Sequence, residues 1–175
     1  MKIVKRLHTP KALLGILFSL AVLAPSASAQ QAPQRTAEKY DNWTAICTTN
    51  TVKSCSIVQG IYIGDSKKPA LHLAIGKLVN SSPGVTTLIL TLPLGIRLPE
   101  GFSIEIGTVI KRQYRFERCI VSGCQAEIPL DAELLNNFKA MNEGRVVFLD
   151  GTKKPIALPF SLKGFTKAFN RVVQP

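Results

Sequence analysis

The sequence has few residues of the types that usually perform catalysis. It contains two histidines, His8 and His72, and only 11 acidic residues against 22 lysines and arginines. Because His8 lies in the N-terminal segment, a Ser-His-Asp or Cys-His arrangement would have to use His72, and no Gly-x-Ser-x-Gly motif is present. Alternation with Leu71 and Leu73 predicts that His72 lies on the opposite face of a strand, exposed or at a rim. We therefore predict no catalytic residues and a protein that is not an enzyme.

Recognisable metal and cofactor motifs are also missing. The chain has four cysteines, which are Cys47, Cys55, Cys119 and Cys124. Their spacing does not fit the two-residue knuckles of structural zinc sites or the Cys-x-x-Cys motif of redox proteins. No glycine-rich phosphate loop is present. Glu105 and Glu117 could be the carboxylate pair of a glycosidase, but strand alternation predicts that both face solvent. We predict no metal site and no cofactor.

Long apolar runs are absent after the first 29 residues. The run 12–23 follows four basic residues and precedes Ala27-Ser-Ala29, which is typical of a signal peptide cleaved before Gln30. Twelve apolar residues form a helix of roughly 18 Å, which is short for a bilayer core, although a retained signal anchor stays an alternative. We expect a chain of 146 residues (175 minus 29) without a membrane span. The expected location is the periplasm, or else the outer membrane or the exterior.

Four cysteines in an exported chain favour two disulfides, for which three pairings are possible. We favour the local pairs Cys47–Cys55 and Cys119–Cys124, because each pair flanks a turn-like segment. Chain entropy does not decide between them, since a long crossed ring such as Cys47–Cys119 would contribute roughly 4.4 kcal/mol against ~2.6 for the ring from Cys47 to Cys55.

Short alternating or apolar runs between Gly, Pro, Asn and Asp predict a mainly β domain over residues 40–173. The expected strands are 43–47, 54–63, 70–79, 85–92, 103–112, 113–119, 124–130, 145–149 and 156–162. We expect a single-domain β-sandwich or partly closed barrel of about eight to ten strands. Trp43 is the only tryptophan and is expected in the core. Residues 30–39 are predicted to form a flexible arm.

Two helices are expected besides the strands. Residues 131–142 begin with Asp131 as a candidate N-cap, place Leu134 and Phe138 on one face, and can end at Gly144. A short C-terminal helix is expected over 164–172. We expect the first helix to pack on the β domain.

The chain is basic, with a formal net charge of +11, which falls to +7 (18 minus 11) without the signal peptide and its four basic residues. The lysines and arginines are scattered and an exported protein does not meet nucleic acid, so we expect none as a partner. We predict instead an anionic envelope component or a protein as the partner, in an oligomeric state that the sequence leaves open. The candidate binding residues are Lys67 and Lys68 in the loop 64–69, the cluster Lys111, Arg112, Arg115 and Arg118, and Lys153 and Lys154 in the loop 150–155.

Five short motifs occur in order between Trp43 and Ala168, over nearly the whole expected mature chain. They are Trp43 followed by Cys47; Cys55-Ser-Ile-Val-Gln59; Leu92-Pro-Leu-Gly-Ile96 with Gly101; Phe116-Glu-Arg-Cys119 with Gly123-Cys124; and Ser161-Leu-Lys-Gly-Phe165 with Ala168. Together they resemble the invasion-associated locus B family of exported bacterial proteins. The resemblance implies a small β-rich periplasmic or envelope domain with paired cysteines, and a link to host-cell invasion in host-associated bacteria.

The resemblance supplies no catalytic residues. We therefore expect a non-enzymatic envelope protein that binds a partner through its basic surface. A periplasmic hydrolase or redox enzyme is the alternative from another class, and an inhibitor or chaperone-like module is a third.

Overall fold

The structure is a computed structural model that describes residues 34–49, 53–77 and 85–173. In chain order the elements are β1 (Gln34–Tyr40), β2 (Trp43–Thr49), β3 (Lys53–Ile61), β4 (Leu71–Lys77), β5 (Thr86–Leu92), β6 (Phe102–Ile106), β7 (Ile110–Tyr114), β8 (Arg118–Ile120), β9 (Gly123–Pro129), α1 (Ala132–Ala140), β10 (Glu143–Leu149), β11 (Pro155–Ser161) and α2 (Phe165–Val173). The predicted signal peptide, 1–29, and the turn expected at 80–84 lie outside the described residues. Neither described helix has the length and apolar character needed to cross a membrane.

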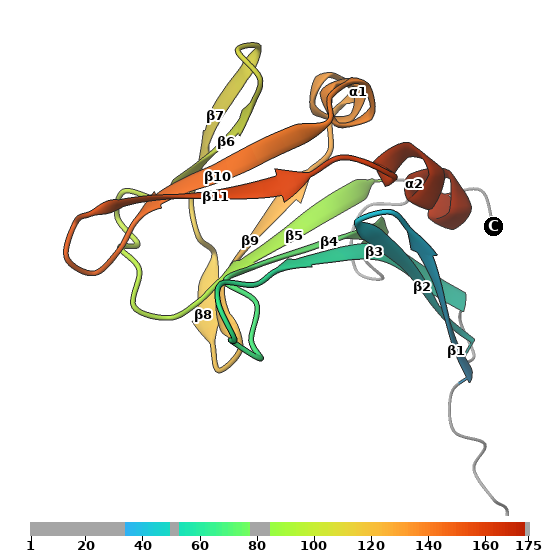
Figure 1. Ribbon diagram of the computed structural model, residues 1–175, viewed down its shortest axis with the longest axis horizontal. Coiled ribbons are helices and arrows are strands. Elements are labelled where there is room, and N and C mark those ends of the chain that lie inside the picture. Colours follow the sequence, from blue (N-terminus) through green and yellow to red (C-terminus); the bar gives the residue numbers. More distant parts are fainter. Residues whose placement is uncertain (1–33, 50–52, 78–84, 174–175) are drawn as a thin grey trace, which may run out of the picture. The chain divides into compact units, whose positions relative to one another are not determined.

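The strands form two antiparallel sheets (Figure 1). The larger sheet has the order β1-β2-β3-β4-β5-β9-β8, and the smaller has the order β11-β10-β6-β7. The chain enters the smaller sheet after β5, returns to the larger one after β7, and enters the smaller one again after α1. The predicted mainly β fold class is therefore confirmed, in its sandwich form.

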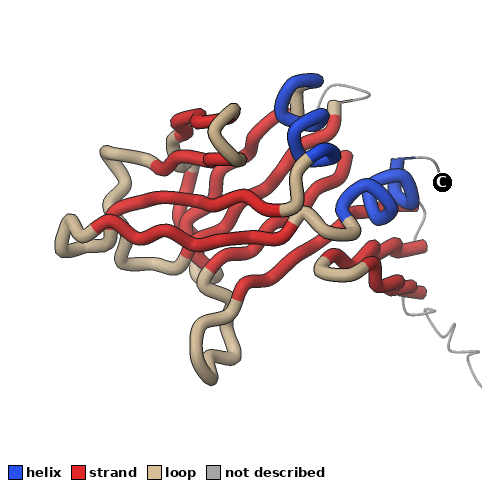
Figure 2. The backbone as a smooth tube through the Cα atoms, turned by 45° about the horizontal axis from the view of Figure 1, so that its top comes forward, coloured by secondary structure: helices blue, strands red, loops and turns tan. Residues whose placement is uncertain are grey.

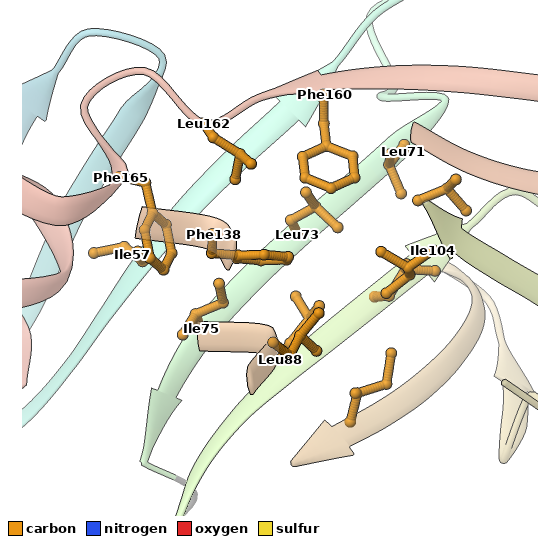
Figure 3. Close-up of a cluster of buried hydrophobic side chains, with 14 of the residues drawn as sticks. Ile57, Leu71, Leu73, Ile75, Leu88, Ile104, Phe138, Phe160, Leu162 and Phe165 are labelled. Atoms are coloured by element: carbon orange, nitrogen blue, oxygen red, sulfur yellow. The ribbon is translucent and has the colours of Figure 1, made fainter. Parts of the chain in front are cut away.

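Both sheets and both helices contribute to one hydrophobic core. Figure 3 shows its centre, with Leu71 and Leu73 of β4, Leu88 of β5, Ile104 of β6, Phe160 of β11, Phe138 of α1 and Phe165 of α2. The Phe138 ring lies 5.3 Å from that of Phe165 and 5.8 Å from that of Phe160. Trp43 is fully buried against Phe165, at a ring distance of 5.3 Å. The predicted core position of Trp43 is thus confirmed.

Figure 2 shows α1 and α2 next to each other, with α2 packed on the β1–β3 part of the larger sheet. Asp131 caps α1 as predicted, because its Oδ1 accepts a hydrogen bond of 2.8 Å from the Leu134 amide. The predicted end at Gly144 is wrong, since α1 ends at Ala140 and Gly144 lies in β10. A Cβ atom at Gly144 would lie 2.5 Å from the Phe160 ring, so this glycine serves packing rather than helix termination.

The flexible arm predicted for residues 30–39 is wrong from Gln34 onward. These residues form β1, which pairs with β2, and the Glu38 carboxylate of β1 accepts from Arg171 Nη2 of α2 at 2.8 Å. The side chains of β1 are exposed as far as Lys39. An edge strand without a buried face has no apolar alternation, so its sequence resembles that of an unstructured arm.

One expected strand is in fact a hairpin. The predicted strand 103–112 turns at residues 107–109, where Gly107 has a φ of +53°, and it forms β6 and β7. Val109 at the turn is 61% exposed, whereas Ile110 is buried. Counting this hairpin and β1, the described residues form eleven strands, more than the number expected.

Both local disulfides are present. Cys47–Cys55 joins directly opposed residues of β2 and β3, and Cys119–Cys124 joins directly opposed residues of β8 and β9. Each bond therefore staples one β-hairpin.

Candidate functional site

The basic cluster predicted at residues 111–118 does not form a free surface patch. Arg112 Nη1 lies 2.5 Å from Asp131 Oδ2, and its Nη2 also contacts Glu133. These contacts connect β7 to the first turn of α1, and hydrogen bonding to Asp131 is the main cause that raises the pKa of Arg112. Arg112 therefore holds a helix in place.

Lys111 projects from the other face of β7 and meets Glu105. Lys111 Nζ lies 3.2 Å from Glu105 Oε1, and Arg145 Nε lies 2.6 Å from Glu105 Oε2. Hydrogen bonds from Arg145 and then Lys111 lower the pKa of Glu105. The prediction that Glu105 faces solvent is wrong, because Glu105 is only 8% exposed beneath these two cationic side chains.

Arg118 lies on the edge strand β8 and is also paired. Its Nη2 is 2.9 Å from Glu127 Oε1, and its Nε donates to Gln125 Oε1 at 3.2 Å. Glu117 is exposed, as predicted, and lies at 4.0 Å from Arg118. Arg115, between β7 and β8, is exposed and forms no ion pair with the described residues. Only one of the four predicted cluster cations is therefore free.

The other four predicted cations lie on two loops at one end of the sheets, away from α2 (Figure 1). We call this the loop end and define it as the loops 62–70, 93–101 and 150–155 with the hairpin 119–124. Lys67 and Lys68 lie on the first loop, and Lys153 and Lys154 on the third. All four are exposed and form no ion pair with the described part of the chain.

A groove of about 780 Å³ lies between three of these segments. Its walls include Ile63 and Pro69 of the first loop, Leu94 of the second, and Val121 at the tip of the hairpin. Ile63 is 59%, Leu94 58% and Val121 97% exposed, so the walls present apolar surface to solvent. Among the described residues that line the groove none is acidic, and Lys68 is one of them.

Polar side chains from three neighbouring strands form the floor of the groove. His72 of β4 is directly opposite Thr91 of β5, which is directly opposite Gln125 of β9. Gln125 Nε2 donates to Thr91 Oγ1 at 3.5 Å. His72 is partly buried here, and burial lowers its pKa because it disfavours the charged imidazolium. The expectation that His72 lies at a rim is refined to a position inside an open groove.

The described residues contain no cluster of three His, Cys, Asp or Glu side chains that could hold a metal ion. Glu105 lies within the smaller sheet, whereas Glu117 borders the larger one. The two carboxylates named as a glycosidase pair are thus placed on different sheets, and His72 joins neither of them in the groove.

Sequence reasoning missed the groove because its walls belong to separate loops. A signal was available for two of the wall residues, since Leu94 and Val121 are large apolar residues inside segments that turn chemistry marks as loops, whereas Ile63 ends the expected strand 54–63. Large apolar residues in turns do not reach the core and stay available to a ligand.

Known proteins resemble this chain in sequence and in fold. A family model described as "Invasion associated locus B (IalB) protein" matches residues 43–173. Two relatives described as Invasion protein B homologs, from Brucella abortus strain 2308 and from Brucella abortus biovar 1 strain 9-941, are each 25% identical over 167 residues, which is 91% of this chain and 94% of the relative.

A solved structure gives the same result for the fold. The crystal structure of invasion associated protein B from Bartonella henselae superposes with a TM-score of 0.68 at 20% identity, and the match covers 79% of this chain and 96% of that one. Because the family model spans most of the chain, including both disulfides and the groove, this chain belongs to the Invasion associated locus B family.

Proposed function

We propose that this protein is exported to the bacterial envelope and acts by binding, without catalysis, a partner on the envelope or on a host-cell surface. The observation that carries the proposal is the distribution of cations. Lys67, Lys68, Lys153 and Lys154 are free of ion pairs with the described residues at the loop end, whereas Lys111, Arg112 and Arg118 are held by carboxylates. A cationic, solvent-exposed end attracts an anionic partner.

The four free cations at the loop end are all lysines, and this narrows the range of possible partners. A lysine ammonium is a compact point charge on a flexible stem and lacks the planar fork with which arginine binds one carboxylate or phosphate in fixed geometry. Four lysines on two loops therefore suit a surface with many anionic groups, such as phospholipid or lipopolysaccharide head groups. The names of the relatives extend the proposal to host-cell invasion, with the outer face of the host membrane as the partner.

Export is supported by the two disulfides, which persist in oxidising compartments. An enzymatic role is less well supported, because the acidic side chains nearest to the predicted basic cluster are engaged in ion pairs that hold the strands and α1. The periplasm is the expected compartment when the partner is a bacterial phospholipid, and the outer membrane or the exterior when it is lipopolysaccharide or a host membrane.

The test reverses the four free lysines in one variant, Lys67→Glu/Lys68→Glu/Lys153→Glu/Lys154→Glu. The control reverses four exposed cations at the other end of the sheets, Arg35→Glu/Lys39→Glu/Lys163→Glu/Lys167→Glu, and has the same net charge. Co-sedimentation with phosphatidylglycerol vesicles should be lost in the first variant and retained in the control. Equal loss in both variants would show an effect of net charge alone and would contradict the proposal.

A second measurement separates the alternative functions. Crosslinking in native envelope extracts should recover lipid or glycan with the wild-type chain. Recovery of one stoichiometric protein partner would indicate an inhibitor or chaperone-like module. Rapid reduction of Cys119–Cys124 by mild thiol, with turnover of a disulfide substrate, would indicate a redox enzyme.

A further inference from the structure

We propose that the loop-end groove binds the hydrocarbon chain of a single-chain anionic amphiphile, with the anionic head group at Lys68. This inference rests on the proposed role of the loop end as a binding surface, and it names the class of ligand. Long-chain carboxylates and the single acyl chain of a lysophospholipid share this chemistry.

The walls of the groove present apolar surface to solvent. Ile63, Leu94 and Val121 come from three separate segments and line the same groove. Each exposes more than half of its surface, and Val121 exposes 97%. Small-molecule sites are concave and lined mainly by apolar side chains, which is the arrangement of these three residues around the groove. A hydrocarbon chain along these walls would remove the surface of all three side chains from water.

The charge of the groove favours an anionic head group. Lys68 lies among the residues that line the groove, and none of the described residues that line it is acidic. Asp65 belongs to the same loop but does not line the groove. An apolar groove with a cation and without a carboxylate favours a ligand that combines a hydrocarbon with a negative head group.

The groove lies on the face of the larger sheet, not at its edge. Its floor is formed by β4, β5 and β9, which all have strands on both sides and whose backbone groups are paired. An extended peptide adds to a sheet at a free edge, where unpaired backbone groups can bond it. A hydrocarbon chain needs no such bonds, so the floor favours a lipid chain over a peptide. The volume of about 780 Å³ lies within the range of small-molecule sites.

The wall that contains Val121 is fixed before any ligand binds. The Cys119–Cys124 disulfide closes the hairpin that carries Val121. Gly123 has a φ of +136°, and a Cβ atom there would lie 2.3 Å from the Leu92 carbonyl oxygen, so the hairpin rests directly on the end of β5. A wall that is held in place loses little freedom on binding.

The experiment titrates the oxidised protein with dodecanoate below its micelle concentration, in a calorimeter. We expect one site per chain. Across a series from decanoate to hexadecanoate, the affinity should rise about fourfold for each added methylene that is buried, and should level off once the groove is full. The cation dodecyltrimethylammonium, with the same chain, should bind at least tenfold more weakly, by the electrostatic argument above.

Matched variants locate the site. Ile63→Asp/Leu94→Asp should weaken dodecanoate binding by about tenfold or more, since it places two carboxylates on the walls. Val109→Asp is the control, because Val109 is equally exposed (61%) but lies in the β6–β7 turn, outside the groove. Lys68→Gln should weaken the binding of dodecanoate and spare that of the cation, whereas Lys154→Gln should change neither.

A photoreactive fatty acid tests the wild-type protein directly, in case a variant does not fold. The label should appear on the peptides that contain Ile63 and Val121. Labelling elsewhere, equal binding of the cation, or affinity that rises without a fixed stoichiometry would overturn the inference. So would a protein from envelope extracts that crosslinks at Val121 and is not displaced by dodecanoate.

Vesicle binding and dodecanoate binding, measured on the same variants, distinguish surface binding by the lysines from ligand binding in the groove. Vesicle binding that depends on the four lysines, without saturable dodecanoate binding, supports surface binding and rejects the groove ligand. Competition by phosphatidylglycerol vesicles would place a two-chain bilayer lipid in the groove and would contradict a single-chain ligand. Vesicles that do not compete would support a free single-chain amphiphile.

Discussion

Gln59 of β3 and Ser161 of β11 form a reciprocal pair of hydrogen bonds between the two sheets. Gln59 Nε2 donates to the Ser161 carbonyl oxygen at 2.9 Å, and the Ser161 amide donates to Gln59 Oε1 at 2.9 Å. Trp43 Nε1 donates to the same carbonyl, also at 2.9 Å. Gln59 is only 6% exposed, so one buried amide side chain completes the backbone bonding at the end of β11.

Replacement of Gln59 by leucine should destabilise the fold by about 1–3 kcal/mol, because it leaves the partly buried amide of Ser161 without a partner. Gln113→Leu is the matched control, since the exposed Gln113 side chain donates a single bond to the Glu100 carbonyl. Its cost should stay within about 0.5 kcal/mol. Urea unfolding followed by Trp43 fluorescence measures both. Equal effects of the two substitutions would show that the inter-sheet bonds do not matter.

Substitution of Gly123 tests the contact between the stapled hairpin and β5. Gly123→Ala should cost more than about 2 kcal/mol, because the residue has a positive φ and its Cβ would meet the Leu92 carbonyl oxygen. Gly64 also has a positive φ, of +55°, but has no atom within 4 Å of a Cβ. Gly64→Ala should therefore cost only about 1–2 kcal/mol, from backbone strain. Thermal unfolding of the two variants should rank them in this order, and the reverse order would contradict the close approach.

Acidification should destabilise the protein through His72. Burial lowers the pKa of His72 below its ordinary value of 6.5, so the unfolded chain takes up a proton at a higher pH than the folded chain does. The stability due to His72 is therefore complete above pH 6.5 and declines as pH falls toward the pKa of the folded state. His72→Gln should remove this part of the pH dependence. The test is a series of urea unfolding midpoints from about pH 7.5 to about pH 3.

Protonation of Glu105 destabilises the protein at lower pH and serves as the internal control. Hydrogen bonds from Arg145 and Lys111 lower the pKa of Glu105 below its ordinary value of 4.5, so the stability due to this carboxylate is complete above about pH 4.5 and declines as pH falls toward the pKa of the folded state. His72→Gln should leave this acid limb unchanged. Identical pH profiles of the wild type and the variant above pH 5 would contradict the assignment to His72.

Removal of each disulfide should have a modest effect. In the chain-entropy model, Cys119→Ala/Cys124→Ala should cost about 2 kcal/mol and Cys47→Ala/Cys55→Ala slightly more, because the second ring is longer. The first variant should also weaken dodecanoate binding, since its ring holds Val121 in the groove wall. The intact oxidised chain should be four hydrogens lighter than the reduced one, as two bonds require. Any free thiol would contradict this pairing.

The sequence predicted a structural feature correctly where the residue concerned has one common physical role. Asp131 before a helical run caps α1 because its carboxylate accepts the bond of an unpaired amide. Each cysteine pair flanks a turn, so antiparallel pairing brings the two sulfur atoms together without help from the rest of the fold. Trp43 is too large and apolar to remain on the surface without a cost.

The failures concern side chains whose partners lie on another element. The positive charges of Arg112 and Lys111 suggested a binding surface. The carboxylates that pair with Arg112 come from the start of α1, which the sequence could not align with β7. Lys111 pairs with Glu105 across the β6–β7 turn, inside a segment that was expected to be one continuous strand. Alternation places Glu105 opposite the buried face of β6, but the prediction that it faces solvent is wrong because long cationic side chains cover it there. The groove depends on three loops that meet only after the larger sheet has formed.

The position of α2 has a consequence for the order of folding. Trp43, near the start of the described chain, is buried by Phe165, which lies close to its end. A chain that emerges from a ribosome or a membrane pore with its N-terminus first cannot cover this tryptophan until the last helix is available. Contacts between such distant positions also form slowly. Burial of Trp43 is therefore a late event in folding, which requires that α2 has already been synthesised.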